Sequence, residues 1–225
     1  MANLGRWMRN VVTRSASPPR NFPKSGFKVI SGVEKLEEEN WEWYKPGLFY
    51  PVRISEVFQS RYQVLGKLGY GSRSTAWLCR DLRWVRRHHQ ARTPLSVNTR
   101  GHRYVTLKVC EQDSPAIRRE LAAYTHLDTI TTSNPGALLV RELLDSFKAT
   151  GPAGEHQCLV HEPLGMSIET LRQLSPGRKI PENLLKVFLI HLLQALDFLH
   201  TDAKMIHAGI QHFGLQSSRA LLEPC

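Results

Sequence analysis

The stretch Leu68-Gly69-Tyr70-Gly71-Ser72-Arg73-Ser74-Thr75-Ala76-Trp77-Leu78 organises the rest of the chain. Its two glycines are one residue apart, with apolar runs before them at 62–65 and after them at 76–79. This pattern predicts a strand, a tight glycine turn and a second strand. Glycine has no Cβ and adopts backbone angles that other residues avoid, so the N–H groups of such a turn can approach a phosphate chain closely. Ordinary hairpins also contain Gly-x-Gly turns, so the turn alone is weak support.

A single lysine, Lys108, interrupts the next apolar run at 104–109. A lysine inside a buried strand is costly unless its charge is paired. Phosphate oxygens on one side, and Glu120 from the helix-like segment that follows, would pair it. The order of glycine turn, strand lysine and helix glutamate is typical of the nucleotide-holding part of protein kinases. The alternative is a plain hairpin whose edge lysine reaches solvent.

Composition sets the broad class of the protein. The 225 residues are enough for one large or two small domains, and 41% of them are hydrophobic. No run approaches the ~18 apolar residues of a membrane span, so we expect no transmembrane segment. The formal net charge of +10 favours an acidic partner such as a nucleotide, RNA or an acidic protein surface. The four scattered cysteines indicate free thiols in a reducing compartment.

The N-terminal region divides into two segments. Residues 1–33 contain no Asp or Glu, so residues 1–40 are predicted to be a basic, disordered tail. A mitochondrial transit peptide is the alternative, because such peptides are rich in Arg and Ser and poor in acid. Residues 41–60 carry Trp41, Trp43 and Tyr44 and are predicted to be an aromatic strap or linker.

Residues 61–162 are predicted to form a small lobe with five strands and one helix. Its third and later strands are expected at 104–109, 138–147 and 156–160. Ser114 and Pro115 suit the start of a helix whose inner face would contain Leu121, Tyr124 and Leu127. Within this lobe, residues 80–103 contain seven arginines and predict a polar insertion, or alternatively an RNA- or anion-binding patch.

The second lobe begins at residue 163. The segment 160–165 reads as a connector, in which Pro163 lacks an N–H and Leu164 is the better hydrogen-bond donor. Residues 181–200 then form the strongest predicted helix, which is apolar nearly all round and therefore expects burial on most of its faces.

Residues 58–207 resemble the serine/threonine protein kinases, specifically the SR-protein kinases of the fungal type. The resemblance rests on the glycine stretch quoted first and on the following segments: Tyr44-Lys45-Pro46-Gly47, Tyr50-Pro51-Val52-Arg53, Leu107-Lys108-Val109, Cys158-Leu159-Val160-His161-Glu162-Pro163-Leu164-Gly165 and Ala195-Leu196-Asp197-Phe198-Leu199-His200. The combination is specific, although no single piece is.

The resemblance implies an α+β fold with a kinase-like N-lobe, a five-stranded antiparallel sheet plus one helix, followed by an incomplete helical C-lobe at 163–225. It also implies ATP with Mg²⁺ as cofactors and Arg/Ser-rich proteins as substrates. Separately, we expect a cytoplasmic or nuclear location. The ATP-binding residues that it implies are Leu68, Gly69, Tyr70, Gly71, Ser74, Ala76, Thr106, Lys108, Glu120, Glu162 and Leu164.

The chain departs from the family at the catalytic loop. Aligned on His207, the positions of the catalytic Asp and of the metal-binding Asn are Gly209 and Gly214, and the loop lysine falls on Gln211. We therefore expect no retained catalytic residue, no metal ligands and an inactive, truncated kinase. The alternatives are a pseudokinase-like scaffold that binds nucleotide or a protein covering the long apolar helix, and a basic RNA- or anion-binding protein.

Overall fold

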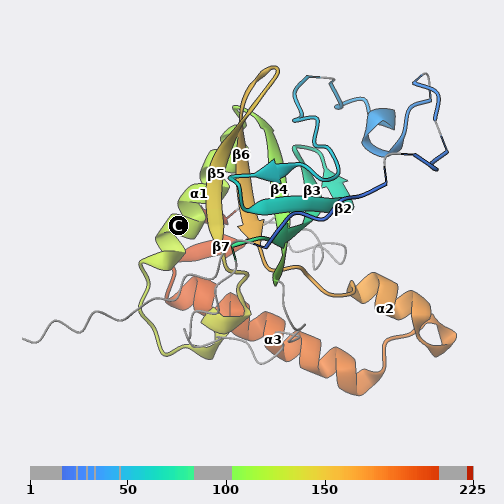
Figure 1. Cartoon of the computed structure of the whole chain (residues 1–225). Coiled ribbons are helices and arrows are strands. Elements are labelled where there is room, and N and C mark those ends of the chain that lie inside the picture. The colour runs from blue at the N-terminus through green and yellow to red at the C-terminus, as the bar shows by residue number, and fades with distance from the viewer. Residues whose placement is uncertain are drawn as a thin grey trace, which may run out of the picture.

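The computed structural model describes residues 17–83, 103–207 and 222–224, except for residues 24, 29, 33 and 46. A six-stranded antiparallel sheet dominates it, with strand order β1-β2-β3-β4-β6-β5 (Figure 1). The strands are β1 (Val57–Phe58), β2 (Tyr62–Gly71), β3 (Ser74–Asp81), β4 (Arg103–Gln112), β5 (Asp145–Gly151) and β6 (Gly154–His161). The predicted five long strands are confirmed, and the two-residue β1 adds a sixth at one edge.

Three α-helices accompany the sheet in the described residues. They are α1 (Pro115–Asp128), which lies beside the sheet, and α2 (Ile168–Leu174) and α3 (Glu182–Thr201), which lie beyond its end (Figure 1). Short 3-10 helices occur at η1 (Glu37–Asn40), η2 (Pro135–Leu139) and η3 (Pro176–Arg178). Strand β7 (Met205–His207) follows α3 and pairs antiparallel with β8 (Leu222–Pro224).

The glycine stretch forms the predicted β2–β3 hairpin, with Gly71 opposite Ser74. The expectation that these glycines adopt backbone angles which other residues avoid is wrong, since neither Gly69 nor Gly71 has a positive φ. A Cβ placed on Gly69 would meet nothing within 4 Å. What glycine provides at this position is open space above the strand, which is the property that a ligand approaching the backbone needs.

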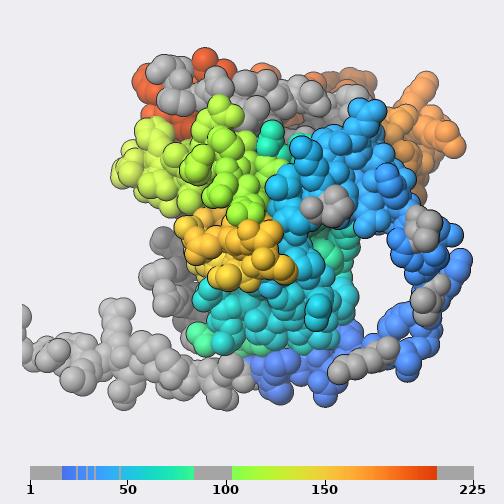
Figure 2. All heavy atoms as spheres, turned by 90° about the horizontal axis from the view of Figure 1, so that it is seen from above, coloured from blue at the N-terminus to red at the C-terminus, as the bar shows by residue number. Residues whose placement is uncertain are grey.

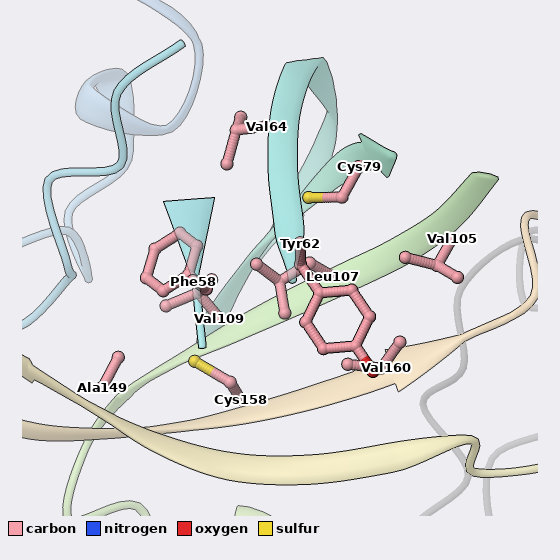
Figure 3. Close-up of a cluster of buried hydrophobic side chains, with 10 residues drawn as sticks. All are labelled: Phe58, Tyr62, Val64, Cys79, Val105, Leu107, Val109, Ala149, Cys158 and Val160. Carbon is pink, nitrogen blue, oxygen red and sulfur yellow. The ribbon is translucent and has the colours of Figure 1, made fainter. Parts of the chain in front are cut away.

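A hydrophobic core fills one side of the sheet and comes almost entirely from the strands (Figure 3). Its buried members are Phe58, Tyr62, Val64, Cys79, Val105, Leu107, Val109, Ala149, Cys158 and Val160. Tyr62 stacks on Phe147 of β5, with ring centres 5.8 Å apart. Burial raises the pKa of the Cys79 and Cys110 thiols to about 12, so both are protonated side chains of the interior at neutral pH.

A second cluster joins the helical part to α1. It contains Ala123 of α1, Phe198 and Leu199 of α3, and Ala203 and Met205 after α3. Polar contacts reinforce it, because Asn134 donates to Asp197 at 2.9 Å and His126 Nε2 lies 2.8 Å from the Ala203 carbonyl oxygen. The C-terminal end of α3 is thereby fixed against the first lobe.

Three local predictions differ from the structure. The strand expected at 138–147 starts only at Asp145: Leu138 and Leu139 belong to η2, which begins where the Asn134 side chain accepts a hydrogen bond from Gly136 N, and residues 140–144 form no regular structure. Ser114 precedes α1 as expected, but its hydroxyl makes no capping bond. On the inner face of α1 the buried residues are Ile117, Ala123 and Tyr124, so of the three predicted only Tyr124 is fully buried.

Parts of the predicted tail and insertion have defined places. Ser17 N donates to Leu82 O at 2.8 Å, and the side chain of Gln63, which is fully buried, exchanges two hydrogen bonds with the backbone of Arg20. Arg80 and Arg103, at the two ends of the predicted insertion, belong to β3 and β4. The rest of that insertion, at 84–102, lies outside the described residues.

Helix α3 is long and apolar enough, by length and composition, to cross a membrane. The sequence-based expectation of no such segment did not include this helix, because its apolar residues are interrupted by polar ones. The central helix of a soluble protein meets the same criteria. In α3 only Phe198 and Leu199 are buried, in the cluster that contains Ala123 of α1. Its middle is much less covered, since Leu185, Val187, Leu189, Ile190 and Leu193 are all more than 40% exposed.

Candidate nucleotide-binding site

Lys108 and Glu120 form an ion pair between β4 and α1. Lys108 Nζ lies 2.7 Å from Glu120 Oε1 and 2.6 Å from Oε2, and each side chain is only 12% exposed. This is the partner that the lysine in an apolar strand required. A partly buried pair with two short charge-assisted bonds holds α1 to the sheet and leaves the ammonium one further donor direction.

Strand pairing brings the predicted residues of three strands side by side. Lys108 lies opposite Ala76, and Ala76 lies opposite Gly69. Ser74 closes the hairpin opposite Gly71, and Thr106 is buried on β4 two residues from Lys108. The glycine turn and the Lys108 backbone are therefore separated only by the width of β3.

The outer residues of the hairpin are open to solvent. Leu68 is 54% exposed and Tyr70 is 40% exposed. An apolar side chain such as Leu68, next to a glycine that nothing crowds, is suited to lie over the flat face of a base.

The connector after β6 contains Glu162 and Leu164, both exposed. The Glu162 carboxylate pairs with Arg103 at 2.8 Å, and its backbone carbonyl oxygen accepts a bond from Arg141 at 2.9 Å. A carbonyl oxygen has two lone pairs, so a base amino group that uses this carbonyl would share it with Arg141. Sequence reasoning missed Arg103 and Arg141, because neither stands in a recognisable motif.

His161 lies directly behind this connector. The ring is buried, its Nδ1 is 3.0 Å from the Glu142 carbonyl oxygen, and its centre is 5.4 Å from that of Tyr124 on α1. Burial, followed by the nearby Arg141 guanidinium, lowers the pKa of His161 to about 4. The imidazole is therefore neutral at physiological pH.

The acidic and aromatic segment before β1 contacts the glycine hairpin, which the sequence did not predict. Lys67 of β2 bonds to Glu37 and Glu38 of η1, and Trp41 bonds to Tyr70. The sequence predicted an aromatic strap at 41–60 and showed an acidic run at 37–39, but nothing in it assigned either to the glycine hairpin.

Two further predictions concern the catalytic loop and the metal. Gly209 and Gly214 lie outside the described residues. Within the part of the chain that the structure describes, no group of three His, Cys, Asp or Glu side chains is placed to hold a metal ion.

The known proteins that this chain is similar to are named as protein kinases. The chain is 42% identical over 204 residues to a serine/threonine protein kinase of Aspergillus fumigatus, covering 91% of this chain and 46% of the relative. It is 35% identical over 176 residues to a serine/threonine-protein kinase SRPK of Physarum polycephalum, covering 78% and 38%. It is 30% identical over 185 residues to human SRSF protein kinase 3, covering 81% and 30%. The chain thus spans less than half the length of these relatives.

The fold is also that of a known structure. A crystallised kinase domain superposes with a TM-score of 0.53 at 17% identity, covering 73% of this chain and 42% of that domain. This likeness concerns the fold alone. No protein-family model matches the chain.

Proposed function

Because the chain belongs to the serine/threonine protein kinase family, with SR-protein kinases among its relatives, we propose that its first lobe binds ATP. The Lys108–Glu120 ion pair carries the proposal. A lysine that is fixed by a glutamate from the neighbouring helix, in a strand next to a glycine hairpin, offers a positioned cation to a phosphate chain. The edge lysine of a plain hairpin would extend into solvent. In this pair each side chain is instead 88% hidden from solvent.

The proposed nucleotide lies between the hairpin and the connector. Lys108 binds phosphate oxygens, and the turn at Gly69 to Gly71 covers them. Leu68, Ala76 and Thr106 line the base, and the backbone of Glu162 and Leu164 bonds its edge. Mg²⁺ is expected for the family, but we assign it no residue here because the described part of the chain contains no fitting ligand set.

For the family reaction, transfer of phosphate from ATP to serine in Arg/Ser-rich proteins, we propose that this 225-residue chain lacks the groups that act on the substrate. Gly209 and Gly214 occupy the positions of the Asp that orients the hydroxyl and of the Asn that binds metal. Removing a single catalytic group commonly costs ~3 kcal/mol or more of transition-state stabilisation. The chain is then a nucleotide-binding scaffold.

Nucleotide binding is tested by calorimetric titration of ATP into the wild type and Lys108→Met. We expect the substitution to weaken binding by at least about tenfold, because the phosphates lose their charge-assisted bond. Lys148→Met is the matched control. It removes a lysine of the same sheet whose ion pair with Glu155, at 2.7 Å, is exposed on the β5–β6 hairpin. Equal affinities in the wild type and Lys108→Met would contradict the proposed site.

Phosphate transfer is tested separately with γ-labelled ATP, Mg²⁺ and an Arg/Ser repeat peptide. We expect no labelled peptide above the level of the Lys108→Met variant. If the wild type labels the peptide and Lys108→Met does not, the chain is an active kinase. That result would contradict the proposed inactivity and would still support the nucleotide site.

A further inference from the structure

A short segment before the first strand makes side-chain hydrogen bonds to β2, the first strand of the glycine hairpin. Lys67 donates to Glu37 at 2.7 Å and to the two carboxylate oxygens of Glu38 at 2.7 and 2.6 Å. Three residues further along β2, the Tyr70 hydroxyl accepts a bond of 3.3 Å from Trp41 Nε1. The two contact points therefore bracket Gly69, and they come from five consecutive residues, 37–41, which we call the clamp.

The clamp is itself anchored at both sides of η1. The Leu36 N–H donates to Glu39 Oε2 at 3.0 Å, which closes the short helix on itself. Trp41 stacks on Trp43, with ring centres 6.4 Å apart, and Leu48 O accepts a bond from Gln112 N at the end of β4. In Figure 2 the blue chain arches around one side of the molecule with open space between part of it and the sheet, and its paler blue continuation lies against the body of the molecule. The segment that follows the clamp, through Leu48, is thereby bonded to the end of the strand that carries Lys108.

A bulge in β2 explains why Lys67 and Tyr70 both contact the clamp. Side chains alternate along a strand, so residues three apart normally face opposite ways. The pairing of β2 with β3 shifts by one residue between Lys67 and Gly69, which restores both side chains to one face. Lys67 Nζ accordingly lies 5.5 Å from the centre of the Tyr70 ring. Leu68, between them, remains open to solvent and free to meet a base.

The charges of the clamp are matched to Lys67. A hydrogen bond from Lys67 is the main reason why the pKa of Glu37 is lowered. Burial alone would lower the pKa of Lys67, which is 26% exposed, but the bonds to Glu37 and Glu38 raise it overall. Two carboxylates thus hold one ammonium.

We propose that Lys67 is a positioning residue for nucleotide binding, which acts by tying the glycine turn to the clamp. This inference rests on the proposed ATP site. A glycine turn that is mobile in the free protein loses conformational entropy when it closes over phosphates, and a turn that is already ordered loses less. The clamp grips Lys67 and Tyr70 and leaves the Leu68 side free, so it orders the turn without occupying the site.

The first test measures the turn without any nucleotide. In Lys67→Met, amide hydrogen exchange of peptides covering 36–41 and 66–72 should rise by about threefold to fivefold, the effect of losing a modest ion-pair network. Lys148→Met is again the matched control, and its exchange in these peptides should equal that of the wild type. The double variant Glu37→Gln/Glu38→Gln removes the same pairs from the other side and leaves β2 untouched, so it guards against misfolding of Lys67→Met. Lys67→Arg should restore wild-type exchange.

The second test separates positioning from general stability. The dissociation constant for ATP should rise by about threefold to fivefold in Lys67→Met, while that for adenosine, which has no phosphates, should change by less than about twofold. A purely structural role would weaken both ligands alike.

The outcomes divide clearly. Unchanged exchange at 66–72 in both Lys67→Met and the double variant would overturn the clamp. Equal loss of ATP and adenosine affinity would overturn the positioning role. Faster exchange at 66–72 in these variants, together with a wild-type protein that binds no ATP, would keep the clamp and reject the proposed function instead.

Discussion

At the scale of single residues, the buried His161 makes the stability of the folded chain depend on pH. Its pKa is lowered to about 4 by burial, then by Arg141, with Lys108 adding to the effect. Between pH 6.5 and 4 the unfolded chain binds a proton at this position and the folded chain does not, so stability falls as pH falls through that range. We expect wild type to lose about 2 kcal/mol more than His161→Phe between pH 7.5 and 5.0. Urea unfolding at the two pH values measures this.

The control for this prediction is His191→Phe. His191 is exposed on α3, and the same substitution there should leave the wild-type pH dependence unchanged. Tyr124 packs on the ring of His161, and Glu142 supplies the carbonyl at its Nδ1, so the absolute stability of His161→Phe will also shift. Only the difference between the two pH values is diagnostic, and an identical difference in wild type and His161→Phe would reject the buried neutral imidazole.

At the scale of elements, the contact between η2 and α3 depends on one glycine. A Cβ on Gly136 would lie 1.9 Å from the Gln194 carbonyl oxygen and 2.9 Å from Phe198 Cβ. Since the first of these atoms is helix backbone, α3 would have to move. We expect Gly136→Ala to lower the free energy of unfolding by at least about 2 kcal/mol, the cost of overpacking a fixed contact. Urea unfolding measures it.

Gly165→Ala is the comparison for this substitution, because a Cβ there meets nothing within 4 Å and the residue has no positive φ. It should stay within about 0.5 kcal/mol of the wild type. Similar losses in the two variants would mean that η2 and α3 do not pack as closely as Gly136 requires.

Prediction from sequence succeeded where chemistry forced a partner. A lysine in an apolar strand had to be paired, and Glu120 pairs with it. It failed where two local preferences competed. The Asn134 side chain starts a 3-10 helix, and this helix includes Leu138 and Leu139, whose apolar character suggested a strand. The clamp could not be found in this way, since the proximity of Glu38 to Lys67 depends on how residues 41–60 cross the sheet.

At the scale of the whole molecule, α3 leaves an apolar surface uncovered. Ile190 and Leu193, one turn apart, are 54% and 63% exposed. Burying side chains of this size contributes about 1.5–3 kcal/mol each. We therefore expect this chain to self-associate with increasing concentration, and Ile190→Gln/Leu193→Gln to weaken that association by at least about tenfold in sedimentation velocity.

Phe27→Gln is the control for surface apolarity in general. Phe27 is 68% exposed but lies in the N-terminal segment, away from α3 in sequence, and its replacement should leave the association unchanged. A wild-type chain that stays monomeric at high concentration would count against the prediction, as would a double variant that associates like the wild type.

The pairing of Gln63 with Arg20 decides how the protein can be shortened. Both hydrogen bonds of a fully enclosed amide are supplied by backbone that lies more than forty residues earlier in the chain. A version beginning at residue 58, where the kinase-like pattern starts, would strip that amide of its donor and its acceptor at once. A shortened version should therefore keep the chain from Ser17, whose N–H donates to the Leu82 carbonyl oxygen at the end of β3.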